Sequence, residues 1–149
     1  MSRVREKNQI SEIEYELKFY KIELGHLLNE KFALEDTLAK YIALYNSMPL
    51  GCIILNKIGL ITDINQAGIH FLGLEKEELV NKSFSRYIAK EYQLLYSQYC
   101  KSVYQNKLPE PCQIKLLTHN PSGFVDCQCE CRAVKTTFSE QEEMLIFIR

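Results

Sequence analysis

The sequence predicts an α+β protein in which a long N-terminal coiled-coil helix precedes a domain with five β-strands. Apolar residues return every three or four positions from Ile10 to Tyr45, which is the period of a coiled coil. After Pro49 this period gives way to short β-branched runs separated by turn residues. The runs fall in the order two strands, several short helices, one longer helix and three strands. We therefore expect a dimerisation helix over residues 1–46 and a compact domain over residues 47–149.

The apolar stripe of the helix indicates a partner. A helix turns once per 3.6 residues, so a repeat of 3.5 residues stays on one side only if the helix supercoils around another. Apolar residues off the stripe, such as Phe19 and Ile22, also fit an alternative in which the helix folds back along its own domain. We predict a homodimer through this helix. Lys31 occupies one stripe position, and the predicted seam residues are Ile10, Ile13, Leu17, Tyr20, Leu24, Leu27, Leu34, Leu38, Tyr41 and Tyr45.

Local signals divide the rest of the chain into elements. Pro49 disfavours helical geometry in the residue before it, so the long helix should end near residues 46–49. Asn65 and Gly73 suit the two ends of a short helix, as N-cap and as C-terminal stop. The expected strands cover residues 51–55, 60–64, 112–116, 125–134 and 144–148, and the expected helices cover 65–73, 76–79 and 91–105.

Composition excludes several classes of partner. The chain has 18 basic and 19 acidic residues, so it has no net field to attract nucleic acid or an anionic membrane surface. The longest apolar run, residues 48–55, is too short to span a bilayer, and the N-terminus has no apolar signal core. We expect a cytoplasmic segment with free thiols, and neither nucleic acid nor a membrane as partner.

Three segments carry a resemblance to a known family. Residues 48–55 (M-P-L-G-C-I-I-L) are similar to a strand with its lead-in commonly written A-P-V-G, residues 61–67 (I-T-D-I-N-Q-A) to I-x-x-x-N-x-A, and residues 77–83 (E-E-L-V-N-K-S) to E-E-L-I-G-K-S. Together they resemble the PAS domain, over residues 41–149. Residues 20–30 also resemble the helix that precedes PAS domains in bacterial sensor histidine kinases and related GGDEF-type regulators.

The resemblance implies a five-stranded antiparallel sheet with helices on one face, and a sensory module that is not an enzyme. The implied function is to bind a small ligand or partner and to relay a conformational change through the dimer. No catalytic motif occurs in the sequence, and a kinase or cyclase effector is expected at the C-terminal side in the full-length protein. Two departures are Asn81, which replaces the usual glycine, and residues 90–92, which lack the aspartate that caps the longer helix in relatives.

The same resemblance bears on cofactors. Haem-binding relatives take a histidine from the longer helix, and none lies in residues 91–105. Flavin-binding light sensors use the motif N-C-R-F-L-Q, where this chain has S-F-S-R at residues 83–86. We predict neither haem nor photochemical flavin, and a small organic ligand stays open. The candidate pocket residues flank the centre of the implied fold: Ile54, Ile64, Phe71, Phe84, Tyr87, Leu95, Tyr99, Ile114, Cys129 and Phe147.

Three of the six cysteines alternate along one expected strand, at Cys127, Cys129 and Cys131. Alternate residues of a strand share a face, so the three thiols should line up on one side. Thiols roughly 7 Å apart along a strand converge poorly on one metal ion, whereas small soft side chains suit a core face. We favour the core interpretation and predict no metal ligands. A cysteine-based metal or redox sensor and a purely structural dimerisation module are the alternatives.

Overall fold

The computed structural model describes residues 1–119, 123–135 and 141–149. The chain divides into two compact units, Met1–Ala43 and Leu44–Arg149, and each unit is described by itself. The first unit is helical, and the second contains the sheet.

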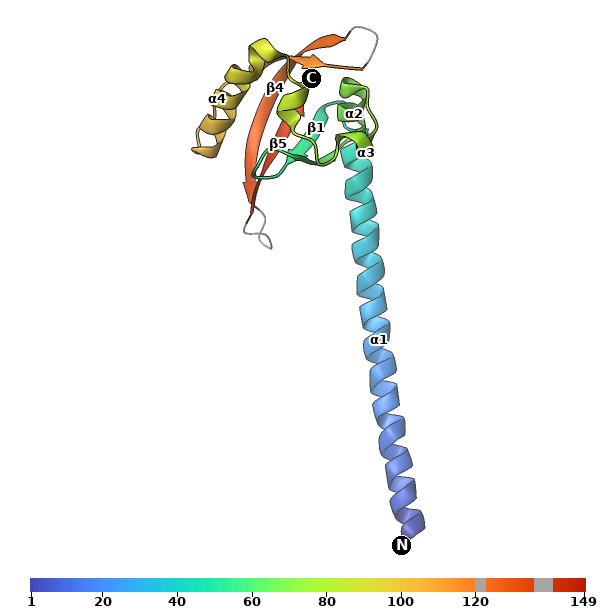
Figure 1. Ribbon diagram of the computed structural model, residues 1–149. Helices are drawn as coiled ribbons and strands as arrows, with labels where there is room; N and C mark the ends of the chain where they lie inside the picture. Colours follow the sequence, from blue (N-terminus) through green and yellow to red (C-terminus); the bar gives the residue numbers. More distant parts are fainter. Residues whose placement is uncertain (120–122, 136–140) are drawn as a thin grey trace. The chain divides into compact units, whose positions relative to one another are not determined.

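The helix α1 (Ser2–Ser47) is continuous (Figure 1) and ends shortly before Pro49, which confirms the predicted stop. The described residues include all of α1, and none of its side chains is buried. The apolar side chains of the stripe from Ile10 to Tyr41 are exposed, Leu34 by 71% and Leu38 by 59%. The coiled coil and its seam stay a prediction. Among the described residues no helix, α1 included, has both the length and the apolarity needed to cross a membrane.

Five strands form one antiparallel sheet in the order β2-β1-β5-β4-β3. The five-stranded antiparallel sheet that the resemblance implied is thus confirmed. β1 and β2 form the expected hairpin, and β5, the last strand in the chain, lies at the centre of the sheet. The strands are β1 (Gly51–Leu55), β2 (Ile61–Ile64), β3 (Cys112–Leu117), β4 (Phe124–Lys135) and β5 (Glu142–Ile148).

Helical segments connect β2 to β3. They are α2 (Gln66–Leu72), α3 (Lys76–Leu79), the 3₁₀ turns η1 (Phe84–Tyr87) and η2 (Lys90–Tyr92), and α4 (Gln93–Tyr104). Asn65 caps α2 as predicted, because its side-chain oxygen accepts the N–H of Gly68 at 3.0 Å, and Gly73 ends the helix with a φ of 69°. α4 begins at Gln93 and not at residue 91, because η2 precedes it and Tyr92 provides no side-chain cap.

Smaller differences from the prediction concern strand ends. β2 begins one residue late, because Leu60 forms only an isolated bridge with Ser83. β5 begins early, at Glu142, because this residue still pairs with Lys135 of β4. Part of the turn expected before β4, residues 120–122, lies outside the described residues.

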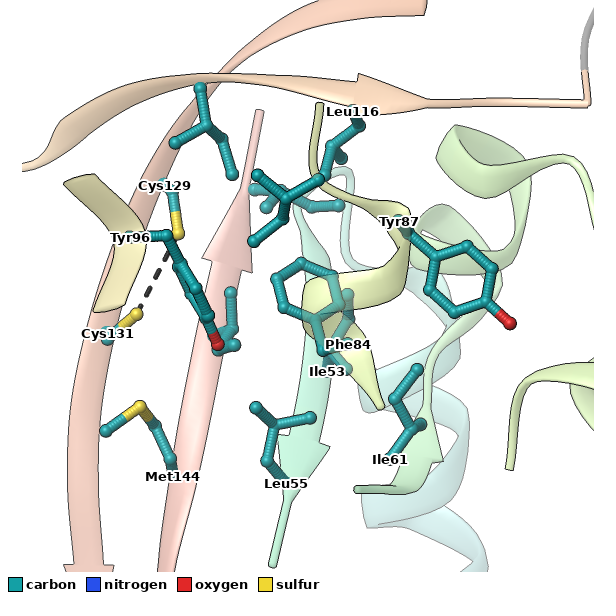
Figure 2. Packing of buried hydrophobic residues seen from close by; sticks show 14 of the residues in the cluster. Ile53, Leu55, Ile61, Phe84, Tyr87, Tyr96, Leu116, Cys129, Cys131 and Met144 are labelled. Atoms are coloured by element: carbon teal, nitrogen blue, oxygen red, sulfur yellow. Dashed lines mark hydrogen bonds between the residues drawn. The ribbon is translucent and has the colours of Figure 1, made fainter. Parts of the chain in front are cut away.

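One hydrophobic core fills the domain (Figure 2). Strand side chains alternate, so Ile53 of β1 and the thiols of Cys129 and Cys131 of β4 all face this core. From the helical side, Phe84 packs edge to face on Tyr96 with ring centroids 5.6 Å apart. Strand and helix side chains meet in this single core, which means that the helices cover one face of the sheet.

Gly51, at the start of β1, lies where the core leaves no room for a side chain. A β-carbon at this position would lie 2.5 Å from Cγ1 of Ile148 and 3.2 Å from the ring of Phe71. This close approach explains why glycine suits the M-P-L-G segment.

Candidate functional site

A cavity of about 400 Å³ opens beside the core, between α4, the β1–β2 hairpin and the segment that leads into η1. Its volume falls in the range of roughly 300–1,000 Å³ that suits small organic ligands. Helix α4 supplies one wall and strand β5 contributes Met144 to another, so a ligand here would contact both a helix and the central strand of the sheet.

The cavity wall has an apolar part and a polar part. Leu55, Tyr96 and Met144 supply apolar surface that is continuous with the core. The hydroxyls of Ser83 and Ser85 lie 2.9 Å apart on the loop before and within η1. The polar groups of the wall include the side chains of Lys57, Ser83, Ser85, Gln93 and Ser97.

Two side chains hold the loops around the cavity. The side-chain amide of Gln93 on α4 donates to the backbone carbonyls of Ser85 at 3.2 Å and Ile88 at 3.3 Å. In the hairpin, the side-chain oxygen of Asn56 accepts the backbone N–H of Ile58 at 3.1 Å. The polar rim is therefore preorganised by hydrogen bonds within the chain.

None of the ten pocket residues predicted from the resemblance is among the lining residues of this cavity. Phe71 packs against the core, and Leu95 is exposed. Ile54 and Phe147 alternate with core-facing residues of β1 and β5, so their side chains lie on the other face of the sheet. Contact of any of the ten residues with a ligand stays a prediction. The structure brings the other six together as buried core residues: Ile64, Phe84, Tyr87, Tyr99, Ile114 and Cys129.

Four cysteine side chains form a row, named the thiol chain below, that runs from the edge strand β3 to the cavity. Cys112 of β3 is the cross-strand partner of Cys129 on β4. The Sγ atoms of Cys129 and Cys131 lie 3.8 Å apart (Figure 2). Hydrogen bonds link Cys129 to Cys112 at one end, and Cys131 to Cys100 of α4 at the other.

The thiol chain has two acidic members. Hydrogen bonds from Cys112 and Cys131 lower the pKa of the Cys129 thiol to about 5, and the hydrogen bond from Cys131 lowers the pKa of Cys100. The same hydrogen bonds raise the pKa of Cys112 and Cys131, which keep their protons. Cys127 lies beyond the row, and mainly its burial raises its pKa to about 12. Cys100 and Cys129 are therefore the members of the row that ionise to thiolates most readily.

The thiol chain is held in place by aromatic residues of α4. The hydroxyl of Tyr99 accepts the backbone N–H of Cys131 at 3.2 Å, which fixes α4 on β4. Tyr96 lies beside Cys129 and Cys131 (Figure 2). In the described part of the chain, no group of three or more His, Cys, Asp or Glu residues could hold a metal ion.

Asn65 forms a second polar centre, where the last turn of α1 meets the sheet. This fully buried amide accepts the backbone N–H groups of Cys52 at 2.8 Å and Gly68 at 3.0 Å. It donates to the carbonyls of Tyr45 at 3.0 Å and Leu50 at 3.0 Å, so all four of its hydrogen-bond positions are used. Tyr45, a predicted seam residue, is partly buried here and its hydroxyl donates to the carbonyl of Cys52 at 3.4 Å. One side chain thus couples the end of α1 to β1 and α2.

Sequence reasoning missed the polar rim of the cavity and the place of Cys100. Ser83 and Ser85 lie in a segment without hydrophobic periodicity, so no pattern marks them as inward. The one available signal was their position, because residues 83–86 stand where flavin-binding relatives have a cofactor motif. Cys100 follows Tyr96 by one helical turn, which places both on the same side of α4.

Comparisons with known proteins agree on the fold. A family model described as the PAS fold matches residues 39–149. A PAS domain from Colwellia psychrerythraea is similar with a TM-score of 0.65 and 14% identity, covering 76% of this chain and 95% of that one. The PAS domain of an HTR-like protein from Haloarcula marismortui reaches 0.64 with 16% identity, covering 81% and 97%. A PAS domain from a two-component sensor histidine kinase reaches 0.61 with 14% identity, covering 78% and 96%. No curated protein matches the sequence.

Proposed function

The chain belongs to the PAS fold family, and on this premise we propose that it is the sensory and dimerisation module of a cytoplasmic signal-transduction protein. PAS domains are in general sensory modules without catalysis of their own. The observation that carries the proposal is the cavity of about 400 Å³ beside the core. A ligand bound there touches α4 and the central strand, and so acts on the packing of the domain.

The wall of the cavity indicates the kind of ligand. Leu55, Tyr96 and Met144 suit an apolar body, whereas the ammonium of Lys57 and the hydroxyls of Ser83 and Ser85 suit a polar or anionic end. A small organic acid or hydroxylated compound combines both features. We expect neither haem nor a photochemical flavin as the ligand.

The relay from the cavity to the dimer would run through packed elements. Asn65 connects the end of α1 to β1 and α2 by four hydrogen bonds, so a shift of β1 would be transmitted to the last turn of α1. The exposed apolar stripe of α1 supports dimerisation, because such a surface gains free energy when a second copy covers it. The ligand shifts the equilibrium between two arrangements only by its difference in affinity for them.

The output is proposed to be a histidine kinase or a diguanylate cyclase in the full-length protein. The support is the resemblance of residues 20–30 to the helix that precedes PAS domains in such regulators, together with the similarity to a PAS domain from a two-component sensor histidine kinase. In that arrangement the catalytic step belongs to the effector, and this chain supplies the signal.

Ligand binding at the cavity is the direct test. Native mass spectrometry reports any small molecule that is purified with the protein, and thermal shift with small organic acids and hydroxylated compounds reports stabilisation. Ser97→Trp fills the cavity mouth from α4 and should abolish both signals. Gln98→Trp, on the next residue of the same helix and outside the lining, is the matched control and should retain them.

Two results would overturn the ligand-sensing part. A thermal shift that survives in Ser97→Trp would mean that the ligand binds elsewhere on the protein. If no compound changes the melting temperature and no molecule accompanies the protein, the cavity is not a ligand site. The remaining assignments would then be the cysteine-based sensor and the structural dimerisation module.

A further inference from the structure

The thiol chain reaches the cavity at one end. Of the cysteines in the described residues, only Cys100 lines the cavity, and it is partly exposed there. Cys129 and Cys131 are each 0% exposed, behind Cys100 on β4. A small reagent that enters the cavity therefore meets Cys100 before any other member of the row.

Cys100 has the properties of a reactive thiol. Its hydrogen bond from Cys131 lowers its pKa, and the thiolate is the form of cysteine that reacts with oxidants. Cys129 also has a lowered pKa, but its burial shields it from solvent. Cys52 and Cys127 are buried and have raised pKa values, mainly because of that burial, which makes them unreactive by comparison.

Cys131 is placed to complete the reaction. It is hydrogen bonded to Cys100 through its thiol, and its backbone N–H donates to Tyr99 at 3.2 Å, which holds α4 against β4 at this level. A disulfide has an S–S bond of about 2.05 Å, so the two thiols must move closer together when it forms. Cys129 also lies close to Cys131, with the Sγ atoms 3.8 Å apart, but Cys129 is fully buried and does not line the cavity, so an oxidant that enters there reaches Cys100 first.

We propose that Cys100 and Cys131 form a peroxide-responsive thiol pair, in which a hydroperoxide that enters the cavity oxidises Cys100 and Cys131 then closes a disulfide between α4 and β4. In the first step the Cys100 thiolate attacks one peroxide oxygen, the O–O bond breaks, and the leaving alkoxide or hydroxide takes a proton. Cys100 is then a sulfenic acid. In the second step the Cys131 sulfur attacks Sγ of Cys100, the S–S bond forms, the S–O bond breaks, and the thiol proton leaves with the hydroxyl as water. Two thiols are oxidised to one disulfide while one peroxide is reduced.

The disulfide would change the site that the cavity provides. The Cys100 side chain would turn from the cavity wall toward β4. A covalent bond would then join α4 to β4, which otherwise meet through noncovalent contacts such as the hydrogen bond to Tyr99. This redox response goes beyond the proposed ligand binding, because it needs only access to Cys100 and operates whether or not the cavity also takes an organic molecule.

Peptide mapping tests the pair directly. The reduced whole chain is treated with equimolar hydrogen peroxide without other oxidants, alkylated and digested with trypsin under non-reducing conditions. Trypsin leaves Cys100 in the peptide 91–101, Cys112 in 108–115 and the three cysteines of β4 in 116–132. We expect 91–101 linked to 116–132, and release of that link by dithiothreitol.

Variants assign the two roles. In Cys131→Ala the link should disappear while dimedone labels Cys100 as a sulfenic acid, and in Cys100→Ala both signals should disappear. Cys52→Ala and Cys127→Ala are the matched buried controls and should react at the wild-type rate. Cys100 is partly exposed, so its variant is expected to fold, and far-ultraviolet circular dichroism checks this.

Three outcomes would overturn the proposal. One is a wild-type link between 108–115 and 116–132, which assigns the disulfide to Cys112 and β4. Another is a link from 91–101 that persists in Cys131→Ala, which assigns it to a different thiol of β4. The third is oxidation of Cys100→Ala at the wild-type rate.

Discussion

The two units of the chain treat the same kind of side chain in opposite ways. In the domain, Leu72 and Leu79 are each 0% exposed, whereas in α1 Leu24 and Leu27 are each 57% exposed. Complete burial of such a side chain contributes roughly 1.5–3 kcal/mol. The domain is therefore stabilised by contacts inside one chain. The exposed stripe of α1 would gain a comparable free energy only if another surface covered it.

The test with the largest expected effect is to make the stripe of α1 polar. Leu24→Glu together with Leu27→Glu should convert the dimer to a monomer, because each substitution removes an apolar contact and brings a charge to the seam. We expect a loss of about 2 kcal/mol or more of dimerisation free energy for each position. Light scattering coupled to size-exclusion chromatography measures the change in mass.

Phe19→Glu together with Ile22→Glu is the matched control. These side chains are also exposed, by 58% and 64%, but they lie roughly opposite the stripe on the helix. The control pair should remain dimeric. Equal loss of the dimer in both pairs, or a wild-type protein that is monomeric at high concentration, would show that the stripe is not the seam.

The next effect tests the joint between α1 and the domain. Asn65→Ala leaves two backbone N–H groups and two carbonyls without their partners, in a place that water does not reach. We expect the free energy of unfolding, measured by urea denaturation, to fall by about 3 kcal/mol or more. Asn65→Asp keeps the acceptor oxygen but turns a second acceptor, and a buried charge when ionised, toward the carbonyls of Tyr45 and Leu50, so it should not restore the stability. A loss below about 1 kcal/mol in Asn65→Ala would contradict the role of this amide.

Much of the fold could be predicted from the sequence because its signals are local. Pro49 ends α1, Asn65 caps α2 and Gly73 terminates it, each through the backbone geometry of its own neighbourhood. Asn81, with a φ of 67°, adopts the left-handed conformation for which relatives use glycine. Such residues act within a few positions of themselves, so one sequence is enough to interpret them.

The candidate site depends on contacts that no local pattern contains. The alternation of Cys127, Cys129 and Cys131 predicted a shared face, but the place of Cys100 depends on the packing of α4 over β4. The apolar pattern also marks residues such as Phe84 as inward without telling which inward residues border empty space. The cavity is instead lined in part by loop residues such as Ser83, whose position is set by tertiary packing.

Glycine substitutions sharpen the comparison, because the same change should have opposite signs in the two units. Gly51→Ala places a β-carbon 2.5 Å from Cγ1 of Ile148 and should lower the free energy of unfolding by about 1–3 kcal/mol. Gly25→Ala in α1 meets no atom within 4 Å and should stabilise the helix by about 0.5–1 kcal/mol. Thermal unfolding of each variant measures both. Destabilisation by Gly25→Ala would mean that α1 is packed closely at this position.

A last, gradual effect is the response of the domain to alkaline pH. Burial raises the pKa of Cys127 to about 12, so the folded domain keeps this proton when the unfolded chain loses it above its ordinary pKa of about 8.5. Stability that is complete below pH of about 8.5 is therefore lost as pH rises further, by about 1.4 kcal/mol per pH unit for this one group. Urea denaturation at a series of pH values measures the slope. Cys127→Ala carries no such proton, so its stability should fall less steeply than that of the wild type, and parallel slopes would mean that Cys127 ionises equally in both states.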